Sequence, residues 1–209
     1  MGSSIEELFR TIPCGPVEAS RPFANRLDPA GGILARATSV VERRLGDLEA
    51  VFADRAAWQA AVAAGDPLVY QVAEIRVPEE EGHLLHCVTA LQPGRVGREY
   101  YATKGHYHAK RATAEIYLCL AGEGFLLMQD ERGHEEALPM TRGALNYIPP
   151  CFAHRTVNTG ASPLVFLSVW PADSGHDYET IARGGFRIGV EEEGGRPRVV
   201  RRVAARGRA

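Results

Sequence analysis

Three histidines and one glutamate have residue types and spacing that could do chemistry. His106 and His108 are separated by one residue, Glu115 follows after a short basic loop, and His154 comes much later. In an extended strand, side chains two positions apart point to the same face, so the first two imidazoles can converge on one point. Imidazole nitrogens and a carboxylate suit iron, manganese, zinc or nickel. The sequence therefore predicts a site for one divalent metal ion and a metal-dependent enzyme.

Short apolar runs separated by turn residues must position these side chains. From Leu68 onward, runs with strand character recur at short intervals, and Gly, Pro, Asp or Asn stand between them. Many short strands with turn signals between them are typical of an all-β sandwich or barrel. The strands are expected at 67–77, 84–91, 99–103, 115–120, 124–129, 135–139, 144–148, 155–158 and 164–170.

The two ends of the chain differ from this pattern. Residues 1–32 are broken by prolines and glycines and predict an N-terminal arm that lies along the body or on a partner subunit. Helical spacing predicts helices at 39–52 and 55–64, the second with Asp54 as its N-cap. The barrel domain with these flanking helices is expected at 33–190. The charged, Arg-rich end at 191–209 predicts a solvated tail.

Composition excludes several classes of partner. Lys plus Arg number 24 and Asp plus Glu 26 in a chain of 209 residues, so no global charge favours nucleic acid or a membrane. No apolar run reaches the ~18 residues of a membrane span, and no signal-peptide layout is present at the N-terminus. The cysteines show no CxxC spacing and are expected to be reduced thiols in a cytoplasmic protein. They are Cys14, Cys87, Cys119 and Cys151.

A two-part motif links the candidate ligands to a known superfamily. Its first part is His-x-His, a spacer, Glu, six residues and Gly, and its second is Gly, five residues, Pro-x-Gly, two residues, His, three residues and Asn. Here the matching positions are His106, His108, Glu115 and Gly122, then Gly143, Pro149, His154 and Asn158, with Cys151 where Gly is usual. At these residues the sequence resembles the cupins, small jelly-roll barrels (double-stranded β-helices) that hold a metal inside.

Longer segments narrow the resemblance. The runs TKGHYHA, AEIYL, PPCFAHRTVN and PADSGHDYETIARGGF are similar to the cupin-type glucose-6-phosphate isomerases, which are known chiefly from archaea. The similarity extends roughly from Gly32 to Val200. It implies an aldose–ketose isomerase that interconverts glucose 6-phosphate and fructose 6-phosphate. Fe²⁺ is the usual metal, with Mn²⁺, Ni²⁺ or Zn²⁺ as alternatives.

The resemblance also implies roles for single residues. The metal ligands are His106, His108, Glu115 and His154, and the phosphate contacts are Thr89, Thr103, Gly105 and Tyr117. Tyr70 lies near the sugar, and the catalytic set comprises Glu115, His106, Tyr70, Trp170 and His176. One position departs from the family, which commonly has Tyr where this chain has Trp170. An indole donates one hydrogen bond but cannot exchange a proton at useful pH.

Isomerisation moves a hydrogen between C1 and C2 of the sugar while the carbonyl and hydroxyl exchange places. Four protein ligands on a six-coordinate ion leave two positions for the two sugar oxygens, and the ion can polarise the carbonyl. In one route Glu115 leaves the metal, removes the C2 proton and delivers it to C1 through an enediol. In the other a hydride passes directly between the carbons. A nearby cation lowers the pKa of a carboxylate and makes it a poorer base, and both routes stay open.

Two other functions fit the same residues. A non-haem iron oxygenase uses a similar ligand set with open positions for O₂, and its activity would require and consume oxygen. A sugar-phosphate sensor would keep the metal and the phosphate contacts without turnover, as Trp170 suggests. In each case we expect a small phosphorylated sugar or similar molecule, no nucleic acid, no membrane, and a homodimer formed through edge strands or the N-terminal arm.

Overall fold

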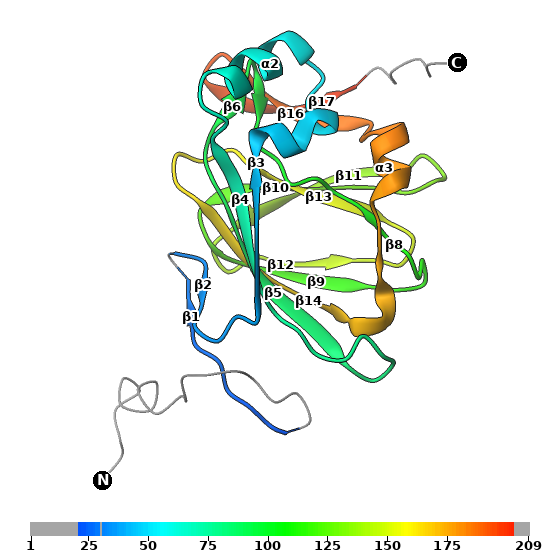
Figure 1. The fold of residues 1–209 in the computed structure, drawn as a ribbon. Helices are drawn as coiled ribbons and strands as arrows, with labels where there is room; N and C mark the ends of the chain where they lie inside the picture. Colours follow the sequence, from blue (N-terminus) through cyan, green and yellow to red (C-terminus); the bar gives the residue numbers. More distant parts are fainter. Residues whose placement is uncertain (1–20, 30, 203–209) are drawn as a thin grey trace.

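The computed structural model describes residues 21–29 and 31–202 and consists of two facing antiparallel sheets (Figure 1). The larger sheet has the strand order β12-β9-β14-β5-β4-β3 and the smaller has the order β11-β10-β13. The larger sheet comprises β3 (Ser39–Arg44), β4 (Leu68–Ile75), β5 (Leu84–Leu91), β9 (Glu115–Ala121), β12 (Leu145–Ile148) and β14 (Leu164–Pro171). The smaller comprises β10 (Glu123–Gln129), β11 (Glu135–Thr141) and β13 (Ala153–Asn158). The prediction of an all-β jelly-roll barrel is confirmed.

Short elements flank the two large sheets. They are β1 (Leu27–Asp28) with β2 (Ile33–Leu34), β8 (Tyr107–His108) with β15 (His176–Asp177), and a sheet of β6 (Arg95–Val96), β7 (Glu99–Tyr100), β16 (Ile188–Glu193) and β17 (Arg196–Arg201). The helices are η1 (Leu45–Val51), α2 (Arg55–Ala63), η2 (Ala172–Ser174) and α3 (Tyr178–Gly184). In Figure 1, η1, α2 and the β16–β17 hairpin gather at one end of the barrel. No helix in the described residues is long and apolar enough to cross a bilayer.

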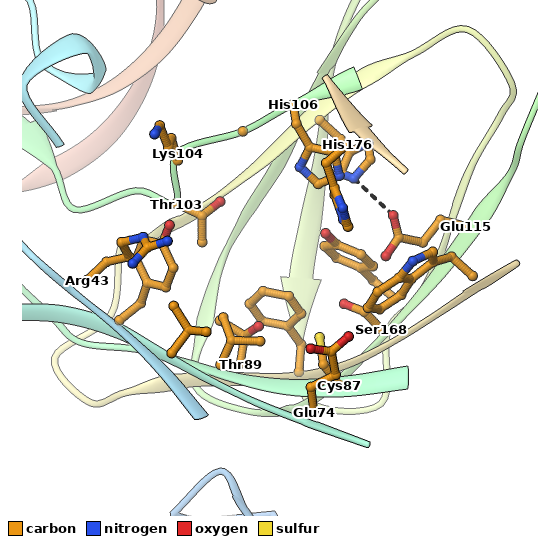
Figure 2. A pocket seen from close by; sticks show the side chains of 18 of the residues that line it. Arg43, Glu74, Cys87, Thr89, Thr103, Lys104, His106, Glu115, Ser168 and His176 are labelled. Carbon is orange, nitrogen blue, oxygen red and sulfur yellow. Dashed lines mark ion pairs between the residues drawn. The ribbon is translucent and has the colours of Figure 1, made fainter. Parts of the chain in front are cut away.

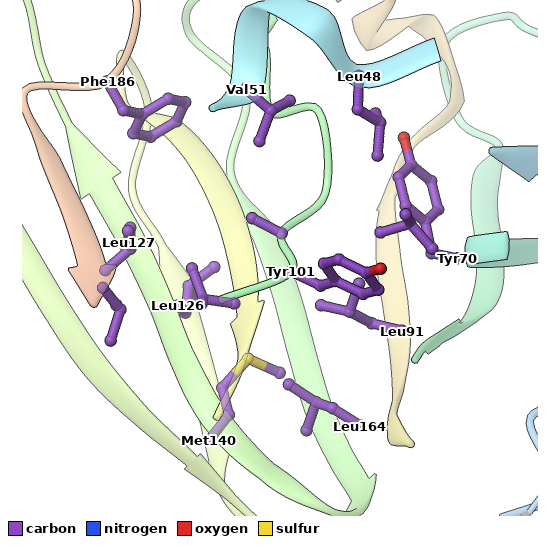
Figure 3. Packing of buried hydrophobic residues seen from close by; sticks show 14 of the residues in the cluster. Leu48, Val51, Tyr70, Leu91, Tyr101, Leu126, Leu127, Met140, Leu164 and Phe186 are labelled. Atoms are coloured by element: carbon purple, nitrogen blue, oxygen red, sulfur yellow. The ribbon is translucent and has the colours of Figure 1, made fainter. Parts of the chain in front are cut away.

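The apolar core fills one part of the space between the sheets (Figure 3). Leu91 on β5 pairs with Leu164 on β14, and both are fully buried together with Leu126 and Met140. Thr89 lies two residues before Leu91 on β5, also points inward, and faces the cavity described below. The barrel interior therefore changes from packed aliphatic side chains to a polar cavity within two strand positions.

The predicted helix at 39–52 is wrong over its first half. Ser39–Arg44 forms the edge strand β3, which pairs with β4 from Ser39 opposite Glu74 to Arg43 opposite Tyr70. Adjacent valines in this segment favour a strand because β-branched side chains fit a pleated sheet. Only Leu45–Val51 is helical, as a 3-10 helix. The second helix is confirmed as α2, and Asp54 accepts a hydrogen bond from the Ala57 N–H at its start.

The described ends of the chain pack on the barrel. Leu27–Asp28 of the predicted arm forms β1, which pairs with β2 just beyond the arm, and Leu34 of β2 packs on the outer face of the larger sheet. The described part of the tail predicted at 191–209 comprises the end of β16 and strand β17, which pairs with β16 up to Arg201 and is largely exposed to solvent. The boundary predicted at residue 190 falls within β16. Arg202 donates to the Val51 carbonyl and forms an ion pair with Glu99, which fastens this hairpin to the body. Residues 1–20, 30 and 203–209, including Cys14, lie outside the described residues.

Candidate metal centre and substrate pocket

Both sheets and the segment between them contribute to the candidate metal centre. The chain before β8 runs beside β13, with His106 bridged to His154, while His108 lies on β8 and Glu115 begins β9. One ligand atom from each of these four residues lies within 4.8 Å of the others. Oε2 of Glu115 is 3.1 Å from Nε2 of His108. It is 3.0 Å from Nε2 of His154, and this ion pair is the dashed line at Glu115 in Figure 2. The structure thus brings together the four predicted ligands.

The hydrogen bonds around the cluster fit a bound cation. Nδ1 of His108 lies 3.2 Å from the Thr113 carbonyl, an acceptor, so Nδ1 carries the proton and Nε2 presents a lone pair. That lone pair faces a carboxylate oxygen of Glu115 at 3.1 Å, an arrangement in which both atoms can bind the same cation. Nε2 of His106 is buried and has no hydrogen-bond partner among the described residues. The four residues therefore fit a divalent metal ion.

Electrostatics keep the ligands in the forms that bind metals. Burial, and then the neighbouring imidazoles of His154 and His176, lower the pKa of His106 well below its ordinary value, so its imidazole is neutral. Burial alone would raise the pKa of Glu115, but the imidazoles of His154 and His108 lower it on balance. Neutral imidazoles and an ionised carboxylate are the protonation states that metal coordination needs.

A network on one side of the cluster fixes the loop between His108 and β9. Arg111 donates to the His108 carbonyl at 2.7 Å and to Asp177 at 2.7 Å, and its own carbonyl accepts from the Cys151 N–H at 2.7 Å. Cys151 has φ of 69°, in the left-handed region that favours glycine. The residue that departs from the motif therefore keeps the backbone shape that the motif's glycine adopts freely.

A cavity of about 290 Å³ adjoins the cluster. His106, Glu115 and His154 line it, whereas His108 does not. The predicted substrate residues also line it, namely Tyr70, Thr89, Thr103, Gly105, Tyr117, Trp170 and His176. Residues far apart in the sequence therefore share one cavity with three of the four ligands.

The predicted substrate residues divide between two parts of the cavity. Tyr117 packs beside the metal cluster, with its ring 5.7 Å from that of His154. Thr103 lies away from Glu115 in Figure 2, and its Oγ1 accepts from the Thr156 N–H at 3.0 Å, which leaves its own proton to donate. Gly105 has φ of 75°, and a Cβ there would collide with the Phe186 ring, so only glycine fits.

Trp170 and His176 form the wall next to the cluster. The Trp170 side chain is buried, and its Nε1 has no hydrogen-bond partner among the described residues. Its ring lies 6.0 Å from that of His176, which in turn lies 4.5 Å from that of His106 and stacks on Tyr178 at 5.6 Å. Burial lowers the pKa of His176, so this wall carries a neutral imidazole.

Sequence reasoning missed several residues that line the same cavity. Arg43 was assigned to a helix, and it instead lies on the cavity side of β3 with Val41. Glu74 lies on the cavity side of β4 with Tyr70, which the period of two along that strand could have indicated. Ser168 faces the cavity opposite Tyr117 on β9.

Comparison with known proteins gives a consistent result. The family model for glucose-6-phosphate isomerase (GPI) matches residues 42–204. The chain is 45% identical over 179 residues to a glucose-6-phosphate isomerase of Pyrococcus horikoshii, covering 86% of this chain and 94% of that protein. It is 48% identical over 174 residues to that of Thermococcus litoralis, covering 83% and 91%. Among solved structures, an oxalate oxidase is 16% identical with a TM-score of 0.46, covering 58% of this chain and 60% of that one.

Proposed function

The chain belongs to the glucose-6-phosphate isomerase family, and we propose that it is a metal-dependent aldose–ketose isomerase that interconverts glucose 6-phosphate and fructose 6-phosphate. The observation that carries the proposal is the cluster of three histidines and one glutamate at the wall of a cavity of about 290 Å³. A cavity of this size suits one small polar molecule. The predicted substrate residues on the same cavity support a phosphorylated sugar.

The reaction requires an electrophile at the carbonyl and a carrier for the migrating hydrogen. A divalent ion held by His106, His108, Glu115 and His154 would supply a Lewis acid that polarises the carbonyl. In the enediol route Glu115 is the proposed proton carrier, because its carboxylate lines the cavity and its lowered pKa keeps it ionised. The same low pKa makes it a weak base, which favours the direct hydride route. Solvent deuterium separates the two, since an enediol route introduces deuterium at the migrating position and a hydride route does not.

Neutral donors are proposed to bind the phosphate. Thr103 keeps a hydroxyl proton to donate, and Thr89 brings a further hydroxyl to the cavity. Tyr117, the other predicted hydroxyl contact, lies beside the metal cluster and is proposed to contact the sugar there. The tight backbone at Gly105 offers an N–H, and phosphate oxygens accept readily from both kinds of donor. Tyr70 is proposed to contact the sugar. Trp170 and His176 are proposed to position it beside the cluster, the first through its unpartnered indole N–H.

A coupled assay on purified protein tests the function. The wild type is expected to convert glucose 6-phosphate to fructose 6-phosphate, and His106→Ala is expected to lose bound metal and activity together. His134→Ala is the matched control, since this histidine pairs with Asp130 and does not line the cavity. Tight binding of the sugar phosphate without turnover would favour a sensor. Oxygen consumption would favour an oxygenase, and either result would overturn the isomerase proposal.

Iron is the proposed metal. Three imidazoles and one carboxylate suit Fe²⁺, although Mn²⁺, Ni²⁺ and Zn²⁺ accept the same donors. Adding each metal in turn to the chelator-treated protein, with metal content measured after purification under anaerobic conditions, tests the choice. Iron in the purified protein together with the highest activity on iron add-back is the expected outcome. Zinc content with zinc-dependent activity would contradict it.

A homodimer is also proposed. The edge strands of the larger sheet are β12 and β3, and they carry exposed apolar side chains at Leu145 (68% exposed), Tyr147 (57%) and Val40 (54%). A second copy that covers these side chains would bury apolar area at an otherwise unprotected sheet edge. Light scattering is expected to give twice the chain mass, and Leu145→Glu with Tyr147→Glu is expected to give monomers. A monomeric wild type would refute the proposal.

The cytoplasm is the proposed compartment. Cys87, Cys119 and Cys151 are free thiols, which fits a reducing environment. A charged sugar phosphate is retained inside cells because it cannot cross a bilayer unaided. Cell fractionation with antibody detection is expected to find the protein in the cytosolic fraction.

A further inference from the structure

Arg43 occupies the part of the cavity that is farthest from the metal cluster along the larger sheet. Its strand β3 is separated from β9, which carries Glu115, by β4, β5 and β14. Figure 2 shows Arg43 and Lys104 on one side of the cavity and Glu115 on the other. Both cationic residues line the cavity. The end of the cavity away from the metal is therefore a cationic end.

No carboxylate in the described part of the chain lies within ion-pair distance of these cations. Arg43 donates to the Glu42 carbonyl at 3.2 Å, and Lys104 lies over the Tyr178 ring at 5.3 Å. Behind them, the buried Arg155 donates to the Lys104 carbonyl at 2.6 Å and also lacks a carboxylate at ion-pair distance within the described residues. Three neighbouring positive charges without acidic partners make this end suited to an anion.

The opposite end of the same wall has the opposite charge. Glu74 follows Tyr70 by four residues on β4, roughly 13 Å along the strand at the usual rise. Tyr70 pairs with Arg43, whereas Glu74 pairs with Ser39, and the Glu74 side chain also lines the cavity. Glu74 forms an ion pair with the exposed Arg76, whose Nε lies 3.8 Å from Oε2 of Glu74. A dianion placed beside Glu74 would be repelled, so the cavity favours one orientation of a molecule with a phosphate at one end.

We propose that Arg43 is a specificity-determining residue that binds the phosphate of the substrate, with Lys104 as a second cation. This rests on the proposed function, because a phosphorylated sugar is taken as the substrate. The planar guanidinium can donate two parallel N–H bonds to phosphate oxygens, which a hydroxyl cannot do. With the phosphate held at the β3 edge and repelled by Glu74, the carbonyl end of the sugar lies at the metal cluster.

Kinetics of Arg43→Gln test the proposal, with Arg43→Lys as a charge-retaining variant. We expect the KM for glucose 6-phosphate to rise roughly 10- to 100-fold, because a charged hydrogen-bonded contact is lost. The kcat should change less than 3-fold. Arg43→Lys should fall between this variant and the wild type. Arg132→Gln is the matched control, since Arg132 is exposed and does not line the cavity. Any activity on unphosphorylated fructose should be the same in the wild type and Arg43→Gln.

Binding of inorganic phosphate to metal-loaded protein supplies a readout independent of turnover. Calorimetry is expected to show phosphate binding to the wild type and to Arg132→Gln, and at least 10-fold weaker binding to Arg43→Gln. An unchanged KM and unchanged phosphate affinity in a folded Arg43→Gln would overturn the inference and leave the isomerase function intact. Phosphate binding that depends on Arg43 in a protein without isomerase activity would support the anion site and refute the proposed function.

Discussion

Replacing Asn158 with alanine should destabilise the protein strongly and leave its chemistry intact. Asn158 ends β13, four residues after the ligand His154, and it is fully buried. Its Nδ2 donates to the Leu91 carbonyl at 2.8 Å and to the Ser162 carbonyl at 2.9 Å, and its Oδ1 accepts from the Gly160 N–H at 2.9 Å. One amide therefore joins β13, β5 and the turn that leads into β14.

The magnitude follows from what each partner loses in Asn158→Ala. The Leu91 carbonyl belongs to a fully buried residue and would lose this donor, which costs about 1–3 kcal/mol. The Ser162 carbonyl and the Gly160 N–H lie nearer to solvent, and each loss costs about 0.5–1.5 kcal/mol. The sum is about 4 kcal/mol in mid-range. For a chain of this size, that corresponds to a Tm lowered by roughly 8–16 °C.

Thermal unfolding followed by circular dichroism measures the effect, and the coupled isomerase assay at a temperature where the variant is folded measures kcat. Asn158→Asp is the matched control, because one carboxyl oxygen can still accept from the Gly160 N–H while the other faces the carbonyls of Leu91 and Ser162. Two carbonyl oxygens beside a carboxylate raise its pKa. The difference in Tm between this variant and the wild type should therefore decrease at low pH, where the protonated carboxyl can donate to one of these carbonyls. A Tm within about 1 °C of the wild type, or a loss of kcat in a stable protein, would refute the assignment of Asn158 to the scaffold.

Three further outcomes are expected. Metal at 100-fold its Kd should stabilise the folded state by about 2.7 kcal/mol and raise Tm by roughly 5–11 °C over chelated protein, and His154→Ala should abolish the shift. Thr103→Val should raise the KM for glucose 6-phosphate with kcat nearly unchanged, and an unaltered KM would show that its hydroxyl does not bind the phosphate. Asp177 accepts from the Thr180 hydroxyl and N–H and pairs with Arg111, and these contacts lower its pKa. Asp177→Ala should therefore lower the free energy of unfolding by about 1 kcal/mol at pH 7. Measured by urea unfolding, this difference between wild type and variant should become smaller as the pH falls from about 5 to 2, because the Asp177 carboxylate of the wild type is then protonated.

The metal end of the cavity could be predicted from the sequence because its signals are local. One residue separates His106 from His108, and each half of the motif lies within about 20 residues of the sequence. The strands that carry Glu115 and His154 have clear turn residues at their ends, so their alternation could be read directly. Few donor types bind a transition metal, and the candidates in a short motif are correspondingly few.

The segments that were mistaken or missed depend on distant pairing. Ser39–Arg44 is a strand that pairs with β4, whereas the apolar residues of 39–52 taken together fall near helical spacing. The β17 segment, rich in arginine, is held by its hairpin with β16 and by the contact of Arg202 with Glu99. Intrinsic propensity is a weak guide where tertiary contacts decide the outcome.

A phosphate site is harder to recognise than a metal site because many groups can donate to it. Hydroxyls, backbone N–H groups and cations all serve, so the fold determines which of them meet. The position of Arg43 illustrates this, since a shift of β3 by one residue would turn Glu42 into the cavity and Arg43 out of it. The register of β3 on β4 changes between Arg43 and Arg44, where Arg44 pairs with Leu68 and Arg43 with Tyr70. Pairing is therefore regular up to Arg43 and irregular directly after it. The regular pairing from Ser39 to Arg43 sets which side chains of β3 face the cavity, and it places a cation rather than a carboxylate at the end opposite the metal.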